Sequence, residues 1–65
     1  VLWRMTKGDK EVSCRVRLVP YGIEVDLLHD EDVVVTHTFE TDTEALRWAS
    51  KKRADREASG WTAQA

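Results

Sequence analysis

This sequence has little cysteine, proline and glycine, and it has no long apolar run. Its one cysteine, Cys14, excludes an internal disulfide, so the chain cannot be a disulfide-stapled mini-protein. No segment approaches the ~20 apolar residues of a membrane-spanning helix, and no charged-then-apolar leader precedes the first predicted strand. These absences predict a cytoplasmic protein that has no membrane partner and folds by the packing of its side chains.

The chain also lacks a strong excess of one charge and the length for a second domain. Its 65 residues carry a formal net charge of −2. Residues 1–41 hold five Lys or Arg against eight Asp or Glu, and residues 42–65 hold five against four. Neither part has the positive excess on which non-specific nucleic-acid binding usually rests. A chain this short buries only ~60% of its unfolded surface, so a protein partner or a second copy in a homodimer is expected to supplement its small core.

The clearest pattern is the strict alternation of apolar and polar residues between Glu11 and Val19, which predicts a half-buried strand. The alternation resumes from Ile23 to Leu27, after a turn that contains Pro20. A shift of one residue would send every side chain to the opposite face, so the shared apolar face defines the register. Including a first strand from Val1 to Thr6, this rule predicts the following pairs: Met5 with Val12, Trp3 with Cys14, Leu18 with Ile23, Val16 with Val25, Cys14 with Leu27, Arg17 with Glu24, and Arg15 with Asp26.

A fourth strand is predicted from Val33 to Phe39, after an acidic loop from His29 to Asp32. Short connections between consecutive strands predict a simple meander in which the first and fourth strands are the edges. The core side of the sheet is expected to carry the apolar residues of the first three strands, Leu18 included. On the fourth strand, the core side is predicted to carry Val33, Val35, His37 and Phe39.

The period of the pattern becomes helical after Phe39. Thr41 and Glu44 have the spacing of a capping box, and a helix is predicted from about Asp42 to Ala58, with Gly60 as its terminator. A lone helix must bury its apolar stripe, and the core side of the sheet is the only large surface that can receive it. The predicted fold class is therefore α+β, a four-stranded antiparallel meander sheet of order 1-2-3-4 with one C-terminal helix packed on one face. A single domain is predicted over residues 1–61, and residues 62–65 are expected to form a frayed C-terminal tail.

No constellation of residues in the sequence is typical of catalysis or metal binding. His37 is interpreted as a buried, satisfied histidine near the end of an edge strand rather than as a base or a ligand, and a catalytic pair with Cys14 would need an exposed thiolate. The loop from His29 to Asp32 offers donors for a hard cation but lacks the alternating carboxylates and central glycine of a calcium loop. It is interpreted as a solvated acidic hairpin. The sequence thus predicts a protein that is not an enzyme, with no catalytic residue, no metal site and no cofactor.

The outer face of the predicted sheet mixes apolar and charged side chains, with basic residues on the first two strands and acidic residues on the third. This face is a candidate docking surface, and Trp61 is expected to be an exposed anchor for a partner. The alternative is an ordinary solvated sheet face. We interpret the chain as a small non-enzymatic interaction module, protein-binding or homodimerising through the outer sheet face and the C-terminal helix. The predicted partner-binding residues are Arg4, Arg15, Arg17, Glu24, Asp26, Val34 and Trp61.

A single-stranded DNA-binding or RNA-binding domain is the alternative function. Basic residues interleaved with aromatic ones can bind such strands by stacking and phosphate contacts, although Asp55 and Glu57 interrupt the basic cluster of the helix. The order of four antiparallel strands and a helix resembles the repeat unit of Pur-alpha-type and Whirly-type single-strand binders, which pair two such units. It is also similar to the order in many small phage and bacterial interaction domains, and the acidic third strand departs from the basic sheets of the single-strand binders. The residues of the nucleic-acid alternative are Arg4, Arg15, Arg17, Lys52, Arg53 and Arg56.

Overall fold

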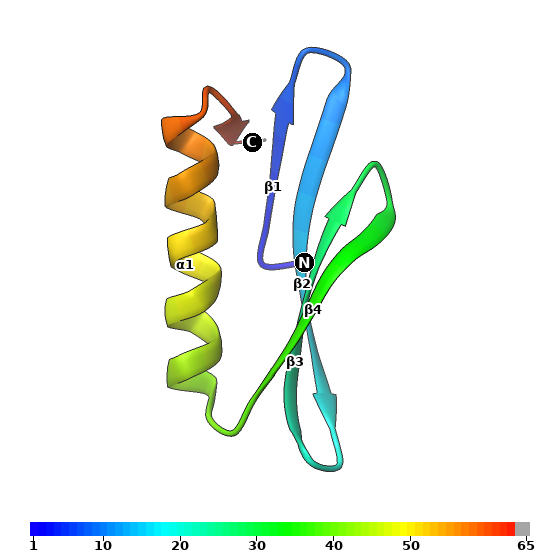
Figure 1. The fold of residues 1–65 in the computed structure, drawn as a ribbon, viewed down its shortest axis with the longest axis vertical. Coiled ribbons are helices and arrows are strands. Elements are labelled where there is room, and N and C mark those ends of the chain that lie inside the picture. The colour runs from blue at the N-terminus through cyan, green and yellow to red at the C-terminus, as the bar shows by residue number, and fades with distance from the viewer. Residues whose placement is uncertain (64–65) are drawn as a thin grey trace.

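The computed structural model describes residues 1–63, which form one antiparallel sheet with one helix against a single face (Figure 1). The sheet has the strand order β4-β3-β2-β1-β5. The predicted α+β class, with a meander sheet and a C-terminal helix packed on it, is confirmed. The elements in chain order are β1 (Trp3–Lys7), β2 (Lys10–Val19), β3 (Gly22–His29), β4 (Asp32–Phe39), α1 (Asp42–Ala58) and β5 (Thr62–Ala63).

The register of the first three strands is the predicted one. Every expected pair between β1, β2 and β3 is present, among them Val16 opposite Val25 and Arg15 opposite Asp26. The register is well determined by the sequence because the apolar face and the charged face both require it.

The C-terminal segment returns to the sheet as a fifth strand. Thr62 and Ala63 of β5 pair with Thr6 and Met5 of β1, so β1 is an inner strand rather than the predicted edge. Gly60, with φ at +93°, turns the chain back at the end of α1. The expectation of a frayed tail is therefore corrected for Thr62 and Ala63, whereas residues 64–65 of that predicted tail lie outside the described residues.

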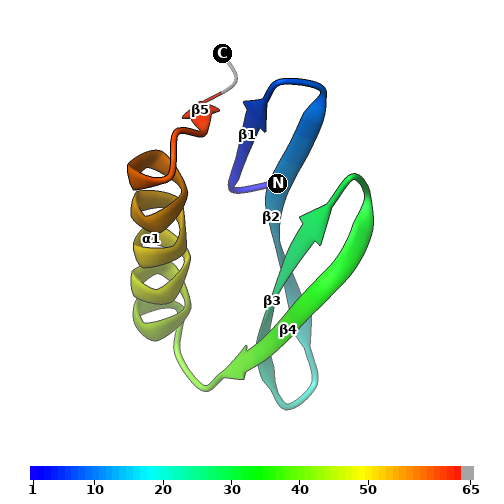
Figure 2. The same ribbon diagram turned by 45° about the horizontal axis from the view of Figure 1, so that its top comes forward.

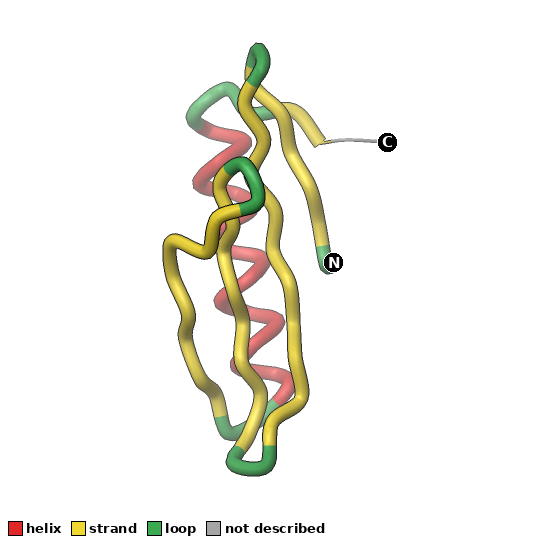
Figure 3. The backbone as a smooth tube through the Cα atoms, turned by 90° about the vertical axis from the view of Figure 1, so that its right-hand side faces the viewer, coloured by secondary structure: helices red, strands yellow, loops and turns green. Residues whose placement is uncertain are grey.

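The core lies between α1 and the face of the sheet that the apolar alternation defines. Figure 2 and Figure 3 show α1 on one side of the sheet, and the strands that it approaches most are β3 and β4. Of the helix residues, only Ala45 and Ala49 are fully buried, and their small side chains let the helix approach the sheet closely. The Trp3 indole Nε1 donates a hydrogen bond to the Ala49 carbonyl oxygen at 3.1 Å, which fastens β1 to the middle of the helix. The buried core consists of Trp3, Met5, Val12, Cys14, Val25, Leu27, Ala45 and Ala49.

The helix begins where the sequence predicts, because Thr41 caps it. The Thr41 hydroxyl accepts a hydrogen bond from the backbone N–H of Glu44 at 3.3 Å and donates to the Glu44 carboxylate at 3.0 Å. At the other end, the Lys7 ammonium donates to the Ser59 carbonyl oxygen at 2.7 Å, where the helix dipole favours positive charge. The N-terminal end of α1 is therefore held by the Thr41 cap, and its C-terminal end is held by Lys7 of β1.

The helix is too short to cover the whole apolar face. Leu18 lies on the core face, opposite Ile23, but is 85% exposed. The tip of the β2–β3 hairpin extends beyond the first turn of α1 (Figure 1), so no helix residue packs over Leu18. The expectation that Leu18 belongs to the core is therefore wrong, although the side of the sheet is correct.

Strand β4 is also left uncovered. All its residues except Phe39 are exposed, including His37, which was predicted to be buried. A bulge opposite Leu27 and Leu28 adds one residue to β4 and places Val33 opposite Leu28, on the outer side of the sheet. The predicted core positions of Val33 and His37 are therefore wrong. The bulge turns Val33 outward, and His37 lies at the rim of the helix-covered face, where its ring stacks on Phe39 and lies beside Trp48 but stays exposed.

Candidate interaction surfaces

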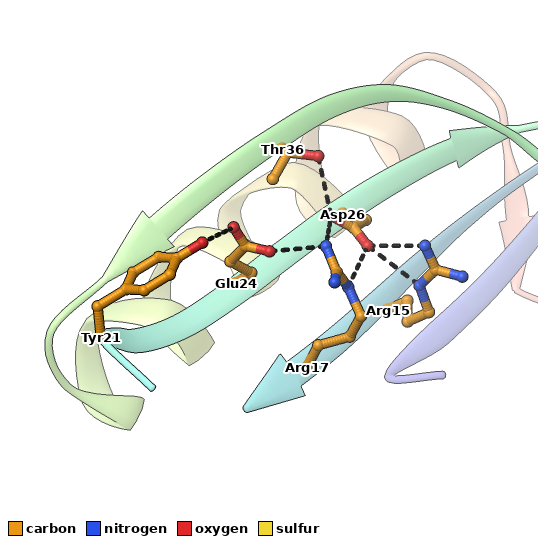
Figure 4. Close-up of polar contacts among 6 residues, drawn as sticks. All are labelled: Arg15, Arg17, Tyr21, Glu24, Asp26 and Thr36. Carbon is orange, nitrogen blue, oxygen red and sulfur yellow. Dashed lines mark hydrogen bonds and ion pairs between the residues drawn. The ribbon is translucent and has the colours of Figure 1, made fainter. Parts of the chain in front are cut away.

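The outer face of the sheet is organised around Asp26, whose side chain is buried at the centre of a polar network (Figure 4). Its Oδ2 accepts hydrogen bonds from Arg15 Nη2 at 2.8 Å and from Arg17 Nε at 2.9 Å. Its Oδ1 accepts from the Thr36 hydroxyl at 2.9 Å. The register brings these groups together, because Arg15 and Thr36 lie directly opposite Asp26 on the neighbouring strands.

This network keeps the Asp26 carboxylate ionised at neutral pH. The hydrogen bond from Arg17, together with those from Arg15 and Thr36, lowers the pKa of Asp26 to about 2 against the opposing effect of desolvation. The same hydrogen bond raises the pKa of Arg17. Both partners therefore stay charged, and the ion pair persists at neutral pH.

A second carboxylate extends the network to the hairpin tip. Glu24 Oε1 accepts a hydrogen bond from Arg17 Nη2 at 2.7 Å, and its Oε2 accepts one from the Tyr21 hydroxyl at 3.1 Å. The Glu24 carboxylate thereby raises the pKa of Tyr21. With two arginines against two carboxylates, this part of the outer face is neutral, and its guanidinium groups are already paired.

The structure does not gather the predicted partner-binding residues on one surface. Arg4 lies on the outer face, with its Nε 3.6 Å from Glu11 Oε1. Asp26 is buried and does not present its carboxylate to a partner. Trp61 packs against the core and is half-buried, which corrects the expectation of an exposed anchor. Of the seven predicted residues, Arg4, Arg15, Arg17, Glu24 and Asp26 lie on the outer face, Val34 lies on β4, and Trp61 follows the helix.

The residues of the nucleic-acid alternative are divided between two sides of the sheet. Three belong to the outer face, and three belong to α1, which covers the opposite face (Figure 3). On the helix, Lys52 Nζ lies 5.3 Å from the Trp48 ring centroid, and the Arg56 guanidinium lies 5.8 Å from the Trp61 ring centroid. No single surface of the described residues carries all six basic side chains.

The sequence does not directly predict that β4 exposes consecutive apolar side chains. Val33, Val34 and Val35 are 49%, 55% and 41% exposed, respectively, on a strand with no neighbour on its outer edge. The consecutive valines carried a signal, because a run without alternation does not define which face each residue occupies. The two buried alanines of α1 were a second signal, since so narrow a stripe covers few strands.

An aromatic row accompanies β4 on the helix side. The His37 ring stacks on Phe39 with centroids 4.6 Å apart, and it lies 5.5 Å from the Trp48 ring. His37 is thus a surface residue in contact with aromatic side chains. Cys14 is buried elsewhere in the core, where desolvation raises the pKa of its thiol to about 11. A neutral buried thiol is not an activated nucleophile.

The acidic loop is a tight turn fastened to β2. Asp30 and Glu31 both have positive φ angles, of 50° and 74°. The Asp30 backbone N–H donates to the Glu11 carbonyl oxygen at 2.9 Å, and Asp30 Oδ1 accepts from the Glu11 N–H at 2.9 Å. One Asp30 oxygen is therefore committed to the backbone.

The described residues show no metal site, membrane-spanning helix or pocket. Within residues 1–63, no three His, Cys, Asp or Glu side chains are grouped so that they could hold a metal ion, and the surface of this part has no pocket. The one helix among these residues is neither long nor apolar enough to cross a membrane. Comparison of the chain with protein-family models, with curated proteins and with solved structures finds no match.

Proposed function

We propose that this chain is a non-enzymatic interaction module that binds a protein partner through its uncovered strand. We name this surface the β4 margin and define it by Val33, Val34, Val35, His37 and Trp48. The observation that supports the proposal is the exposure of the three consecutive valines, at 41–55% each, on an edge of the sheet. Val33 lies on the outer side and Val35 on the side of α1, so the valines flank the edge on both faces, and a strand added to that edge could cover all three.

The valines alone would not supply a useful affinity. Completing the burial of a half-exposed valine is worth about 1 kcal/mol, so three of them contribute about 3 kcal/mol. A micromolar complex requires about 8 kcal/mol net of the cost of association. The proposal therefore needs further contacts, which the unpaired backbone of β4 and the aromatic row of His37 and Trp48 can provide.

The outer face and the helix, which the sequence analysis favoured, contribute less in this proposal. Arg15 and Arg17 are already hydrogen-bonded to carboxylates of their own sheet, so a partner would have to compete with those bonds. The nucleic-acid alternative stays a prediction that no contact in the structure favours. Its discriminating test is the salt dependence of oligonucleotide binding, which is steep when phosphates are contacted.

The experiment that tests the proposal combines sedimentation with affinity capture. The chain is immobilised and exposed to extract of its source cells, beside a variant that carries Val34→Glu and Val35→Glu. Leu18→Glu is the matched control, because Leu18 is exposed and apolar but lies at the opposite end of the sheet. We expect a protein that the chain and the Leu18 variant retain and the margin variant loses. A chain that sediments as a monomer and retains no protein would contradict the proposal.

A further inference from the structure

We propose that the free edge of β4 binds an extended segment of the partner as an additional strand, and that this segment has an uncharged, β-forming centre with Lys or Arg at both ends. The inference rests on the proposed function and adds to it the backbone conformation and the charge pattern of the partner. Three features of the described residues carry it: the unpaired edge, its acidic ends, and the alternation of its side chains.

The two edges of the sheet differ in what they can bind. One edge is β5, which has two residues, and the other is β4, which has eight. Alternate residues of an edge strand direct their N–H and C=O groups away from the sheet, so β4 offers a row of unpaired groups that β5 cannot match. Natural edges are usually blunted by lysine or proline, and β4 contains neither. Its bulge, at Val34, is the one such device it has.

Both ends of β4 are acidic, and its middle is uncharged apart from the titratable ring of His37. The acidic residues are Asp30, Glu31 and Asp32 at one end and Glu40, Asp42 and Glu44 at the other. Among these six and within residues 1–63, only Asp30 forms an ion pair, with His29 Nδ1 at 3.5 Å when that ring is protonated. A strand with cations at both ends would therefore meet acidic side chains at both ends, of which Asp30 also accepts from the Glu11 N–H and Glu44 from the Thr41 hydroxyl. Such complementarity at the rim of an interface directs association and selects the partner.

A second copy of this chain fits the same edge poorly. Antiparallel pairing of two β4 strands would bring Asp32 of one copy towards Glu40 of the other, at both ends of the interface. Parallel pairing would bring each acidic end beside itself. Like charges meet in either arrangement, and like charges placed opposite each other destabilise a pair of strands. The charge pattern therefore favours a partner of different sequence over self-association.

The side chains of β4 define what the added strand should carry on each face. Val35 and His37 lie on the side of α1, where His37 is beside Trp48, whereas Thr36 and Thr38 lie on the outer side. Residues of the added strand that point towards α1 would contact apolar and aromatic groups. Those that point outward would contact threonine, where valine or threonine suits a cross-strand pair. The expected centre thus alternates between aromatic or aliphatic residues and β-branched ones.

The test uses three fluorescein-labelled peptides of about ten residues, with fluorescence anisotropy as the readout. The first has two lysines at each end of a centre of alternating tyrosine, valine and threonine. The second has the same centre with glutamates at the ends, and the third has the lysines with a proline in the middle. The chain is compared with a variant carrying Asp32→Lys and Glu40→Lys and with a charge-matched control carrying Asp9→Lys and Asp55→Lys. All four positions are exposed and have no ion pair within the described residues.

We expect the first peptide to bind the chain and the control variant equally, and to bind the Asp32→Lys, Glu40→Lys variant roughly tenfold or more weakly. The glutamate and proline peptides should not bind. The inference is overturned if the proline peptide binds as well as the first, which would indicate charge attraction without strand addition, or if the first peptide fails to bind. The peptide comparison needs only the unaltered chain, so it decides the matter even if a variant fails to fold. Capture of a partner by the chain without binding of the first peptide would refute this inference alone, whereas failure of both would refute the proposed function as well.

Discussion

Replacing Asp26 with asparagine removes the charge at the centre of the outer-face network while keeping the size of the side chain. Three side chains from two neighbouring strands donate to this carboxylate, namely Arg15, Arg17 and Thr36. The amide cannot accept from all of them, because one of its two positions is itself a donor. Asp26→Asn should therefore destabilise the junction of β2, β3 and β4.

The size of the effect follows from two independent estimates. The pKa of Asp26 falls from 3.8 to about 2 on folding, which corresponds to about 2 kcal/mol of stability at neutral pH. Hydrogen bonds to a charged group contribute ~1.5–3 kcal/mol in general. The Arg15 and Arg17 side chains are 43% and 45% exposed, so water can solvate them once the carboxylate is gone. We therefore expect a loss of about 2 kcal/mol, or roughly 8–16 °C in Tm for a domain of this size.

The assay is urea unfolding followed by tryptophan fluorescence as a function of pH. A carboxylate whose folded pKa is depressed stabilises the protein above its unfolded pKa and loses that contribution as the pH falls through the folded one. The difference between the chain and Asp26→Asn should thus be full at neutral pH and should vanish as the pH falls from about 4 to about 2. Glu40→Gln is the control, because this exposed carboxylate forms no ion pair within residues 1–63 and should change stability by less than ~0.5 kcal/mol. An Asp26→Asn variant as stable as the unaltered chain at neutral pH would refute the reasoning.

Three further predictions concern the backbone and the buried thiol. Gly22→Ala should lower the free energy of unfolding in urea by about 3 kcal/mol, because the added Cβ would lie 2.5 Å from the Phe39 carbonyl oxygen. Gly8→Ala is the control and should lower it by only about 1 kcal/mol, because the space around Gly8 is open. Equal losses of stability in the two variants would contradict the contact at Phe39. Glu31→Gly should raise stability by about 1 kcal/mol, because glycine adopts the positive φ of 74° without strain; an unchanged or lowered urea midpoint would contradict this account of the turn. Cys14 should react with a thiol reagent roughly a hundredfold more slowly in the native protein than in urea, since it is buried and the pKa of its thiol is about 11; equal rates would contradict its burial.

The sequence predicts most of the fold because two independent requirements, one on the apolar face and one on the charged face, give the same strand register. Between β2 and β3, a shift by one residue would bury Arg15 and Arg17 in the core and would also separate them from Glu24 and Asp26. The helix start is equally well determined by the Thr41 cap. These features depend on neighbours in the sequence or on adjacent strands, which a pattern of residues describes directly.

The wrong predictions concern features that depend on how the elements are placed in space, such as how far the helix reaches over the sheet. The run of three valines leaves the face of each residue undefined, but it does not indicate that a bulge turns Val33 outward. The exposure of Leu18 and His37 depends on how far α1 reaches over the sheet, and the return of Thr62 depends on the C-terminal end of α1 lying close to β1 in space. The site that we propose accordingly lies on β4 and not on the charged outer face.

Backbone amide exchange measured by NMR tests the role of β4 most directly. Spectra of the chain are recorded alone and with the lysine-flanked peptide, and protection is compared residue by residue. We predict that alternate amides between Val33 and Thr38 become protected on binding while those of β2 and α1 keep their rates. Protection or shift changes confined to Arg15 and Arg17, or to the surroundings of Trp61, would contradict the claim that the uncovered strand is the docking edge.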